Sequence, residues 1–202
     1  MVVTDPPATA RPDAEARRQQ ILDAACACVR RAGFHGASMQ EIAQAAGLSV
    51  GQIYRYFASK EAIIAAIVGQ DLAEMREKFA EFEREPGPVG KTVVRHCGES
   101  IDKCFDRNRA ALVLEVLAEA ARNPRVECIV READGQERAL VRRMLERDRK
   151  PHWTDEDLVA RGEILSAIFD GLVMRGVNNP DADREAMKPI LQAVIRCVLE
   201  ET

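Results

Sequence analysis

The fold of this chain is decided by SMQEIAQAAGLSVGQIYRYFASK, residues 38–60. Ser38–Glu41 has the S-x-x-E pattern of a capping box, in which the Ser and Glu side chains satisfy two free amides at the start of a helix. That predicted helix ends just before Gly47, where a tight turn needs the left-handed conformation that glycine adopts freely. Ser49 is placed to cap a third, short helix over about residues 50–57. The stretch therefore predicts two helices joined by a sharp turn.

Apolar and polar residues fall on different faces of these predicted helices. The expected inward face, which holds the pair at a fixed angle, consists of Ile42, Ala43, Ala46, Leu48 and Ile53. The outward face of the third helix is expected to carry Gly51, Gln52, Tyr54, Arg55 and Tyr56. A short, exposed helix rich in hydrogen-bond donors fits the major groove of DNA.

Helical periodicity dominates the rest of the chain, and no run alternates as a strand would. A first helix is expected over residues 13–32, and a fourth helix, capped by Ser59, is expected to reach about Arg84. Further helices are expected over residues 91–106, 109–122, 125–149, 154–175 and 182–200. Pro189 either kinks the last of these or begins it as a first-turn proline. The predicted fold is all-α, with a three-helix head, a larger helical body and about nine helices.

Proline and glycine mark the expected boundaries. The predicted parts are a flexible segment over residues 1–12, a helix-turn-helix domain over 13–60, a connecting helix over 61–85 and a larger domain over 86–202. No apolar run reaches the ~18 residues of a membrane span. The N-terminus lacks the apolar region of a secretory signal, so we expect a cytoplasmic protein without membrane contact.

The net charge of −4 is unevenly distributed along the chain. Residues 11–60 contain seven basic and four acidic residues, a net charge of +3, so the remainder carries −7. Positive charge at the N-terminal end suits a face that meets phosphate. The excess is small, so hydrogen bonds must supply much of any contact with DNA.

Residues 15–65 resemble the DNA-binding head of TetR-type regulators. The family pattern has three parts: an amphipathic helix ending in Gly-Phe, an S/T-x-x-x-I-A-x-x-A-G-hydrophobic-S core and a Y-x-Y/H-F-x-S/N-K ending. All three occur here at the right spacing, in ILDAACACVRRAGF, SMQEIAQAAGLS and YRYFASK. The resemblance implies a ligand-responsive regulator, most simply a repressor that binds a palindromic operator on double-stranded DNA as a homodimer and is released by a small-molecule effector. An activator of the same fold is the alternative.

The resemblance also implies which residues meet DNA. The implied contacts are Ser38, Gln40, Ser49, Val50, Gly51, Gln52, Tyr54, Arg55, Tyr56 and Lys60. Gln40, Gln52, Tyr54 and Arg55 are the candidate base readers, whereas Ser38, Tyr56 and Lys60 are expected on the phosphate backbone. Many members carry a basic or polar residue at the position of Val50, so a contact there is either missing or made to a thymine methyl. Tyr54 has the alternative of a partly buried ring, and Arg55 that of a solvated surface arginine.

The resemblance implies that the body binds the effector and joins two subunits. The residues expected to line the effector cavity are His96, Cys97, Cys104, Leu112, Glu115, Val116, Glu119 and Phe169. The expected dimer stripe is Leu165, Ile168, Phe169, Leu172 and Val173. Plainer alternatives remain for some of them: a surface histidine for His96, packing for the two cysteines, and pairing with Arg122 for Glu119.

No cofactor or metal site is predicted. None of the six cysteines forms a CxxC pair, and no Cys/His spacing matches a zinc module. An all-α enzyme is a competing hypothesis, but HExxH, GxSxG, Walker and GxGxxG motifs are missing from the sequence. A small-molecule binding protein without DNA binding is a third hypothesis.

Overall fold

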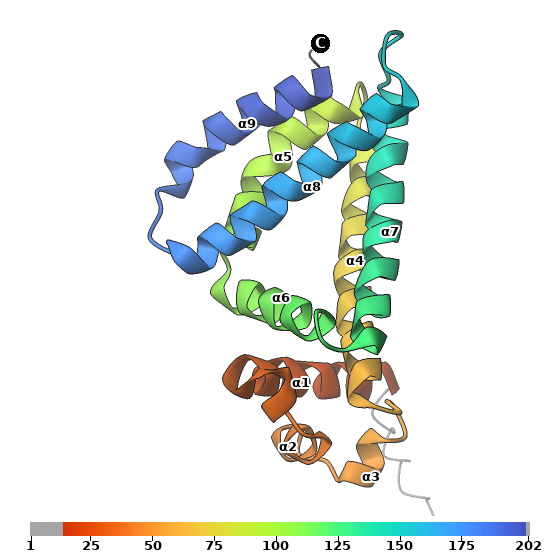
Figure 1. Cartoon of the computed structure of the whole chain (residues 1–202), viewed down its shortest axis with the longest axis vertical. Coiled ribbons are helices and arrows are strands. Elements are labelled where there is room, and N and C mark those ends of the chain that lie inside the picture. Colours follow the sequence, from red (N-terminus) through yellow and green to blue (C-terminus); the bar gives the residue numbers. More distant parts are fainter. Residues whose placement is uncertain (1–13, 201–202) are drawn as a thin grey trace, which may run out of the picture. The chain divides into compact units, whose positions relative to one another are not determined.

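The computed structural model describes residues 14–200, and the segment expected to be flexible, residues 1–12, lies outside this range. Within it the regular structure is entirely α-helical, as predicted (Figure 1). The helices are α1 (Ala14–Gly36), α2 (Met39–Ala45), α3 (Val50–Ile53), α4 (Lys60–Arg84), α5 (Val89–Cys104), α6 (Arg107–Ala120), α7 (Pro124–Arg147), α8 (Asp155–Asn178) and α9 (Arg184–Glu200). No helix of this range is long and apolar enough to cross a membrane.

The chain forms two compact units, and the division falls within α4, between Ile63 and Ile64. The first unit contains α1, α2, α3 and the first turn of α4. The second unit contains the remainder of α4 and helices α5 to α9. The break at Pro86–Pro88 lies inside the second unit, because Phe82 before it and Val89 after it belong to one apolar core.

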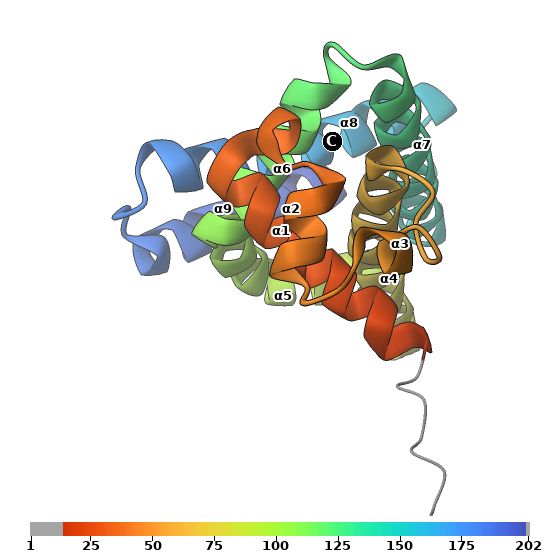
Figure 2. The same cartoon turned by 90° about the horizontal axis from the view of Figure 1, so that it is seen from below.

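In the first unit, α1 packs against α2 and α2 against α3 (Figure 2). The predicted inward residues Ile42, Ala43 and Ile53 are almost fully buried. The turn between α2 and α3 depends on Gly47, which has a φ of 65° and therefore the left-handed conformation predicted for it. Gly33 also has a positive φ, 71°, and interrupts α1 where the sequence predicted its end.

Helix α3 is shorter than predicted, because its regular part covers only Val50–Ile53. Tight turns follow it, in which Arg55 N–H donates to the Gln52 carbonyl and Tyr56 N–H donates to the Ile53 carbonyl. Hydrogen bonds from residue i to i−3 wind the chain more tightly than an α-helix does. The spacing of apolar residues in the sequence does not distinguish such turns from a helix, so it did not predict that α3 ends at Ile53. The stretch after Gly47 therefore begins as a helix, over Val50–Ile53, and continues as tight turns to Tyr56.

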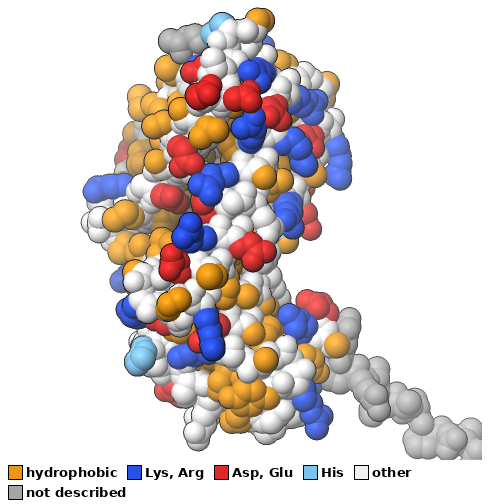
Figure 3. Space-filling view, turned by 45° about the vertical axis from the view of Figure 1, so that its right-hand side comes forward, with side chains coloured by type: hydrophobic (Ala, Val, Ile, Leu, Met, Phe, Trp, Pro, Cys, Tyr) orange, Lys and Arg blue, Asp and Glu red, His pale blue; other side chains and the backbone are white. Residues whose placement is uncertain are grey.

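The second unit is built around one apolar core, drawn from α4, α5, α7, α8 and α9 and from the buried Trp153 between α7 and α8. Helix α9 begins before Pro189, because the Asp183 side chain accepts a hydrogen bond from Ala186 N–H at 3.0 Å. Pro189 therefore lies inside the helix, and the alternative that it begins α9 is wrong. Basic and acidic side chains are interspersed over the face in Figure 3.

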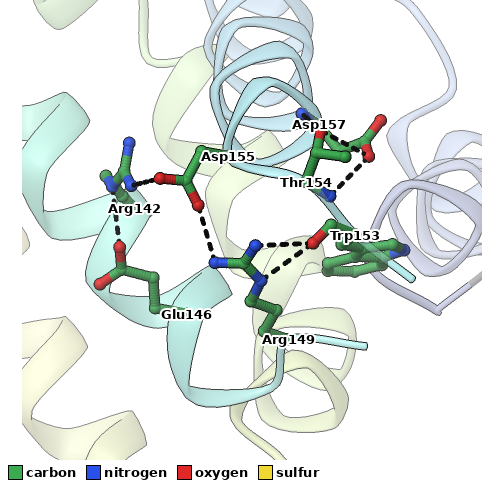
Figure 4. Close-up of polar contacts among 7 residues, drawn as sticks. All are labelled: Arg142, Glu146, Arg149, Trp153, Thr154, Asp155 and Asp157. Atoms are coloured by element: carbon green, nitrogen blue, oxygen red, sulfur yellow. Dashed lines mark hydrogen bonds and ion pairs between the residues drawn. The ribbon is translucent and has the colours of Figure 1, made fainter. Parts of the chain in front are cut away.

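The connection between α7 and α8 is fixed by a polar network (Figure 4). Arg149 donates to the Trp153 carbonyl from two nitrogens, at 3.0 and 2.7 Å, and pairs with Asp155 at 2.8 Å. The Arg149 guanidinium lowers the pKa of Asp155. Thr154 and Asp157 form a capping box at the start of α8, as the sequence predicted for Thr154. These contacts set where α8 begins.

Candidate DNA-binding site

The ten predicted DNA contacts all lie in the first unit, and none of them is buried. The exposed residues are Ser38, Gln40, Ser49, Gly51, Gln52, Tyr54 and Arg55, and the half-buried residues are Val50, Tyr56 and Lys60. They belong to the ends of α2 and α3, the turn after α3 and the start of α4. One continuous stretch of chain thus supplies a largely exposed set of polar and aromatic groups.

The start of α2 is held by the predicted capping box. Glu41 N–H donates to the Ser38 hydroxyl at 3.1 Å, and Ser38 N–H donates to the Glu41 carboxylate at 2.8 Å. The backbone N–H and hydroxyl of Ser38 lower the pKa of Glu41, so its carboxylate is ionised at neutral pH. A phosphate at this helix end meets that negative charge, which weakens the predicted Ser38–phosphate contact.

A second capping box limits what Gln52 can do. The Ser49 hydroxyl accepts from Gln52 N–H at 3.2 Å, and the Gln52 side-chain oxygen accepts from Ser49 N–H at 2.8 Å. Only the side-chain NH₂ group of Gln52 is left for a base. Gln52 can therefore donate to an acceptor such as guanine O6 or N7, but the two-bond Gln–adenine pairing also needs its oxygen.

Tyr54 and Arg55 are the most open candidates for reading bases. Tyr54 is 51% exposed, so it is not part of the core of the first unit. Arg55 is exposed, and none of the contacts found among residues 14–200 engages its guanidinium. Phe57, two residues further on, is only 3% exposed and anchors the segment in the core of its unit.

Lys60 has a role that the sequence did not reveal. Its ammonium group donates to the Phe34 carbonyl at 2.7 Å and lies 4.3 Å from the centre of the Phe34 ring. The cation therefore satisfies a carbonyl near the end of α1. A phosphate contact by Lys60 uses the remaining N–H groups of this ammonium.

The variant Gly51→Ala tests whether DNA lies close to the backbone at Gly51, because its effect on DNA affinity can be distinguished from its effect on stability. A Cβ at Gly51 meets no other atom of the chain within 4 Å, so alanine is expected to stabilise the unit by about 0.5–1 kcal/mol. If DNA lies against this backbone, operator affinity falls tenfold or more while the thermal midpoint rises. Fluorescence anisotropy and differential scanning calorimetry measure the two effects, and unchanged affinity contradicts a close approach here.

The predicted effector residues lie on three helices of the second unit. His96, Cys97 and Cys104 are on α5, Leu112, Glu115, Val116 and Glu119 are on α6, and Phe169 is on α8. His96 Nδ1 lies 3.1 Å from Glu99, its Nε2 lies 3.4 Å from Glu85, and its ring stacks on Phe82. His96 is thus part of a charged network between α4 and α5.

Glu119 is buried and fully engaged. One carboxylate oxygen pairs with Arg122 at 2.7 Å, and the other accepts from the Asn123 side chain at 3.0 Å. Asn123 caps α7, so these bonds fasten the end of α6 to the start of α7. The alternative of pairing with Arg122 is confirmed.

Four charged groups of this unit were missed by sequence reasoning. Asp71 on α4 pairs with Arg109 on α6 at 2.8 Å, and burial raises the pKa of Asp71 against the effect of Arg109. Burial and neighbouring carboxylates raise the pKa values of Glu137 on α7 and Asp170 on α8. These residues are far apart in the sequence and share no motif, so only the packing of four helices reveals them.

Cys97 belongs to the apolar core of the second unit, and Cys104 packs against it. The Cys97 thiol is buried and donates to the Val94 carbonyl at 3.1 Å, and the Cys104 thiol donates to the Phe169 carbonyl at 3.8 Å. Burial raises the pKa of both thiols, that of Cys104 to about 11. Between Ala14 and Glu200, no group of His, Cys, Asp and Glu side chains is arranged to hold a metal ion.

The pKa of Cys104 predicts slow alkylation. Relative to a thiol of pKa 9.0, a thiol of pKa about 11 has about 100-fold less thiolate at neutral pH. Iodoacetamide is therefore expected to label the exposed Cys128 first, with the Cys104 rate still rising as the pH approaches 11. Peptide mass spectrometry across a pH series measures both rates. Equal labelling of the two at pH 7 contradicts this expectation.

Two hollows of the described residues, 14–200, can be compared with the predicted effector residues. The larger, about 490 Å³, is an open depression of the first unit lined by Ala16, Gln19, Gln20, Asp23, Ala24, Ala45 and Ala46. The smaller, about 10 Å³, is lined by Gly90, Met144, Leu145, Asp148, Trp153 and Leu199. None of the predicted effector residues lines either hollow, so the effector site stays a prediction.

The predicted dimer stripe of α8 is turned inward. Leu165 and Leu172 are buried in the core of the second unit, Ile168 and Phe169 pack against that core, and Val173 is half-buried. A stripe that joins two subunits has to be exposed in the single chain, whereas Leu165 and Leu172 are buried and therefore not available to a partner subunit. Helix α8 carries apolar residues on two faces, and periodicity cannot tell which face meets the core of its own chain.

The second apolar face of α8 is open to solvent. It consists of Ala160, Ile164, Ala167, Gly171 and Met174, of which only Gly171 is half-buried. Their spacing of three and four residues places them on one side of the helix. An exposed stripe with the same spacing on α9 consists of Ala186, Pro189, Ile190, Ala193, Val194 and Cys197. These two sets are called the outer stripes below.

Both units match known protein families. Residues 21–67 match the family described as "Bacterial regulatory proteins, tetR family". Residues 93–200 match the family described as "BetI-type transcriptional repressor, C-terminal". The first match contains the helix-turn-helix, and the second covers more than half of the chain.

Individual relatives agree with these matches. The HTH-type transcriptional regulator UidR of Escherichia coli is 37% identical over 122 residues, which span 59% of this chain and 59% of UidR. The HTH-type transcriptional repressor Rv1474c of Mycobacterium tuberculosis is 29% identical over 85% of this chain and 88% of its own length. The structure of GusR from Salmonella enterica superimposes with a TM-score of 0.73 at 26% identity, covering 94% of this chain and 98% of GusR.

The capped helix-turn-helix, the all-α fold and the two family matches lead to one assignment. Members of these families regulate transcription and are not enzymes. The chain belongs to the TetR family of helix-turn-helix transcriptional regulators.

Proposed function

We propose that this protein is a cytoplasmic repressor that binds a palindromic DNA operator as a homodimer and is released by a small-molecule effector. The observation that carries the proposal is the exposed segment from Ser49 to Tyr56, which a capped helix start and the buried Phe57 hold in place. Repression is favoured over activation by the match to a family described as a transcriptional repressor and by the repressor Rv1474c.

The predicted contact residues fall into two groups, those that contact bases and those that contact the phosphate backbone. We expect Arg55, Tyr54 and the NH₂ group of Gln52 to read base edges, and we expect Tyr56 and Lys60 to contact phosphate. Phosphate contacts fix register and base contacts carry specificity. Because residues 11–60 carry a net charge of only +3, we expect a modest dependence of affinity on salt.

The outer stripes of α8 and α9 are the proposed dimer interface. Met174 is 54% exposed and Ile190 is 67% exposed, so each stripe places a large apolar side chain in contact with solvent in the single chain. A contiguous apolar surface of this kind marks a contact with another protein surface. A second copy presents the same stripes, so a two-fold interface buries both sets. The two heads must then reach half-sites about 34–36 Å apart, or a multiple of that distance.

The effector is proposed to act on the second unit and to be sensed through α4. That helix contains the boundary between the two units, so it is the segment through which we expect an effector bound to the second unit to act on the first. An effector needs a differential affinity of only ~1–3 kcal/mol for the two states to regulate binding.

Arg55→Ala tests DNA reading directly. Loss of a base contact is expected to cost about 1–3 kcal/mol of operator affinity and to relax specificity at one position of each half-site. Arg30→Ala is the matched control, because Arg30 is also an exposed arginine of the first unit but lies on α1 outside the predicted contacts. Anisotropy titrations at two salt concentrations, with the DNA flanking the gene and with single-base variants, measure both effects.

Two outcomes contradict the proposal. If the wild-type protein shows no salt-sensitive, sequence-selective binding, the DNA-binding function is wrong. If a reporter driven by the bound promoter falls rather than rises when the gene is deleted, the protein is an activator and repression is wrong.

A further inference from the structure

An arginine outside the predicted contact surface holds the segment that carries the base readers. Arg18 on α1 donates from Nη1 to the Tyr56 carbonyl at 3.2 Å. Its guanidinium carbon lies 4.5 Å from the centre of the Phe57 ring, which is almost fully buried. One half-buried side chain therefore contacts both residues that follow the base-reading turn.

The segment needs such a contact because α3 is only four residues long. The carbonyl groups at the end of a helix have no partner within the helix, and Tyr56 lies where no further helical turn follows. A guanidinium suits this place, because it donates hydrogen bonds in a fixed plane, stacks on an aromatic face and complements the negative end of a helix. Arg18 is 38 residues away in sequence, so the bond is a tertiary contact.

Helix α1 also holds the end of α2. Gln20 donates from its side-chain nitrogen to the Ala46 carbonyl at 2.6 Å, and the Gln20 oxygen accepts from Arg17 at 2.7 Å. The carbonyl ends of both helices of the motif are thus bonded to one helix. Contacts from α1 therefore add to the Gly47 turn in holding α2 and α3 together.

We propose that Arg18 is a positioning residue for sequence recognition, which acts through Tyr56 and Phe57 to fix where Tyr54 and Arg55 point. This inference rests on the proposed DNA-binding function. The proposed role of Arg18 requires no contact with DNA, because its guanidinium acts on a carbonyl and a ring inside its own unit. A phosphate contact by the same arginine predicts a different salt dependence.

The DNA test compares Arg18→Met with Arg30→Met. Both variants lose one positive charge from α1, but only the first loses the bond to Tyr56. Arg18→Met is expected to lower the ratio of operator to random-sequence affinity about tenfold, with the slope of log affinity against log salt unchanged. Arg30→Met is expected to leave the ratio unchanged. A slope reduced by about 1 together with an unchanged ratio means that Arg18 touches phosphate, and it overturns the inference.

A second, conservative variant tests the inference in case Arg18→Met does not fold. Arg18→Lys keeps a positive charge and an N–H donor on a long side chain, but it loses the flat group over Phe57. Its specificity ratio is expected to lie between those of the wild type and Arg18→Met. A ratio equal to that of the wild type for both variants overturns the inference.

A measurement without DNA separates this inference from the proposed function. The chain contains two tyrosines, Tyr54 and Tyr56, so their ring signals in an NMR spectrum report only on this turn. Arg18→Met is expected to shift the Tyr56 ring signals, whereas Arg30→Met leaves both rings unchanged. Unchanged tyrosine signals in Arg18→Met overturn the inference whatever the DNA result. Absence of operator binding by the wild type overturns the proposed function alone.

Discussion

Ile190→Glu is expected to convert the protein into a monomer with at least about 100-fold lower operator affinity. Ile190 is 67% exposed near the middle of the outer stripe of α9, so the change leaves the core of its own chain untouched. In the proposed dimer, the same change buries an unpaired carboxylate on each side of the two-fold axis, which costs several kcal/mol. The proposed dimer contacts both half-sites of the operator, whereas a single protomer contacts only one of them.

Leu117→Glu is the matched control for this prediction. Leu117 is an exposed apolar residue of similar kind, 47% exposed, but it lies on α6 and outside the outer stripes. Leu117→Glu is expected to leave unchanged both the molecular mass measured by sedimentation and the affinity for the operator. If Ile190→Glu stays dimeric, the outer stripe of α9 is not the interface.

Gly176→Ala is expected to lower the free energy of unfolding by about 1–3 kcal/mol. A Cβ at Gly176 comes within 2.8 Å of the Cys104 carbonyl oxygen and 2.9 Å of the Phe105 Cα. Both are backbone atoms at the end of α5, so no side-chain rotation relieves the clash and α8 must move away from α5. That movement opens the core that the two helices share.

Gly135→Ala provides the comparison for Gly176→Ala. Gly135 is a helical glycine of α7 whose added Cβ meets nothing within 4 Å. Its replacement is expected to raise the free energy of unfolding by about 0.5–1 kcal/mol, because alanine favours the helix. Chemical denaturation at one fixed protein concentration measures both variants. Equal stabilities for the two contradict the tight approach of α8 to α5.

Sequence alone determined the features that depend on near neighbours in the chain. Apart from α1 and α3, the helix bounds agree with the prediction to within three residues, because caps, prolines and glycines act over one or two turns. The Ser38 capping box and the left-handed Gly47 follow from the same local rules. The TetR-type motif is also contiguous, and the ten predicted contacts come from one stretch that folds into one exposed segment.

Only the tertiary structure determined which group each of these side chains contacts. Lys60 binds the Phe34 carbonyl and Arg18 binds the Tyr56 carbonyl, although nothing within a few residues of either cation indicates these partners. Leu165 lies in the core and Ile164, beside it, lies outside, because both faces of α8 are apolar and only packing against α5 and α7 selects one. Local rules determine where a helix begins and ends, whereas its buried face depends on helices that are distant in the sequence.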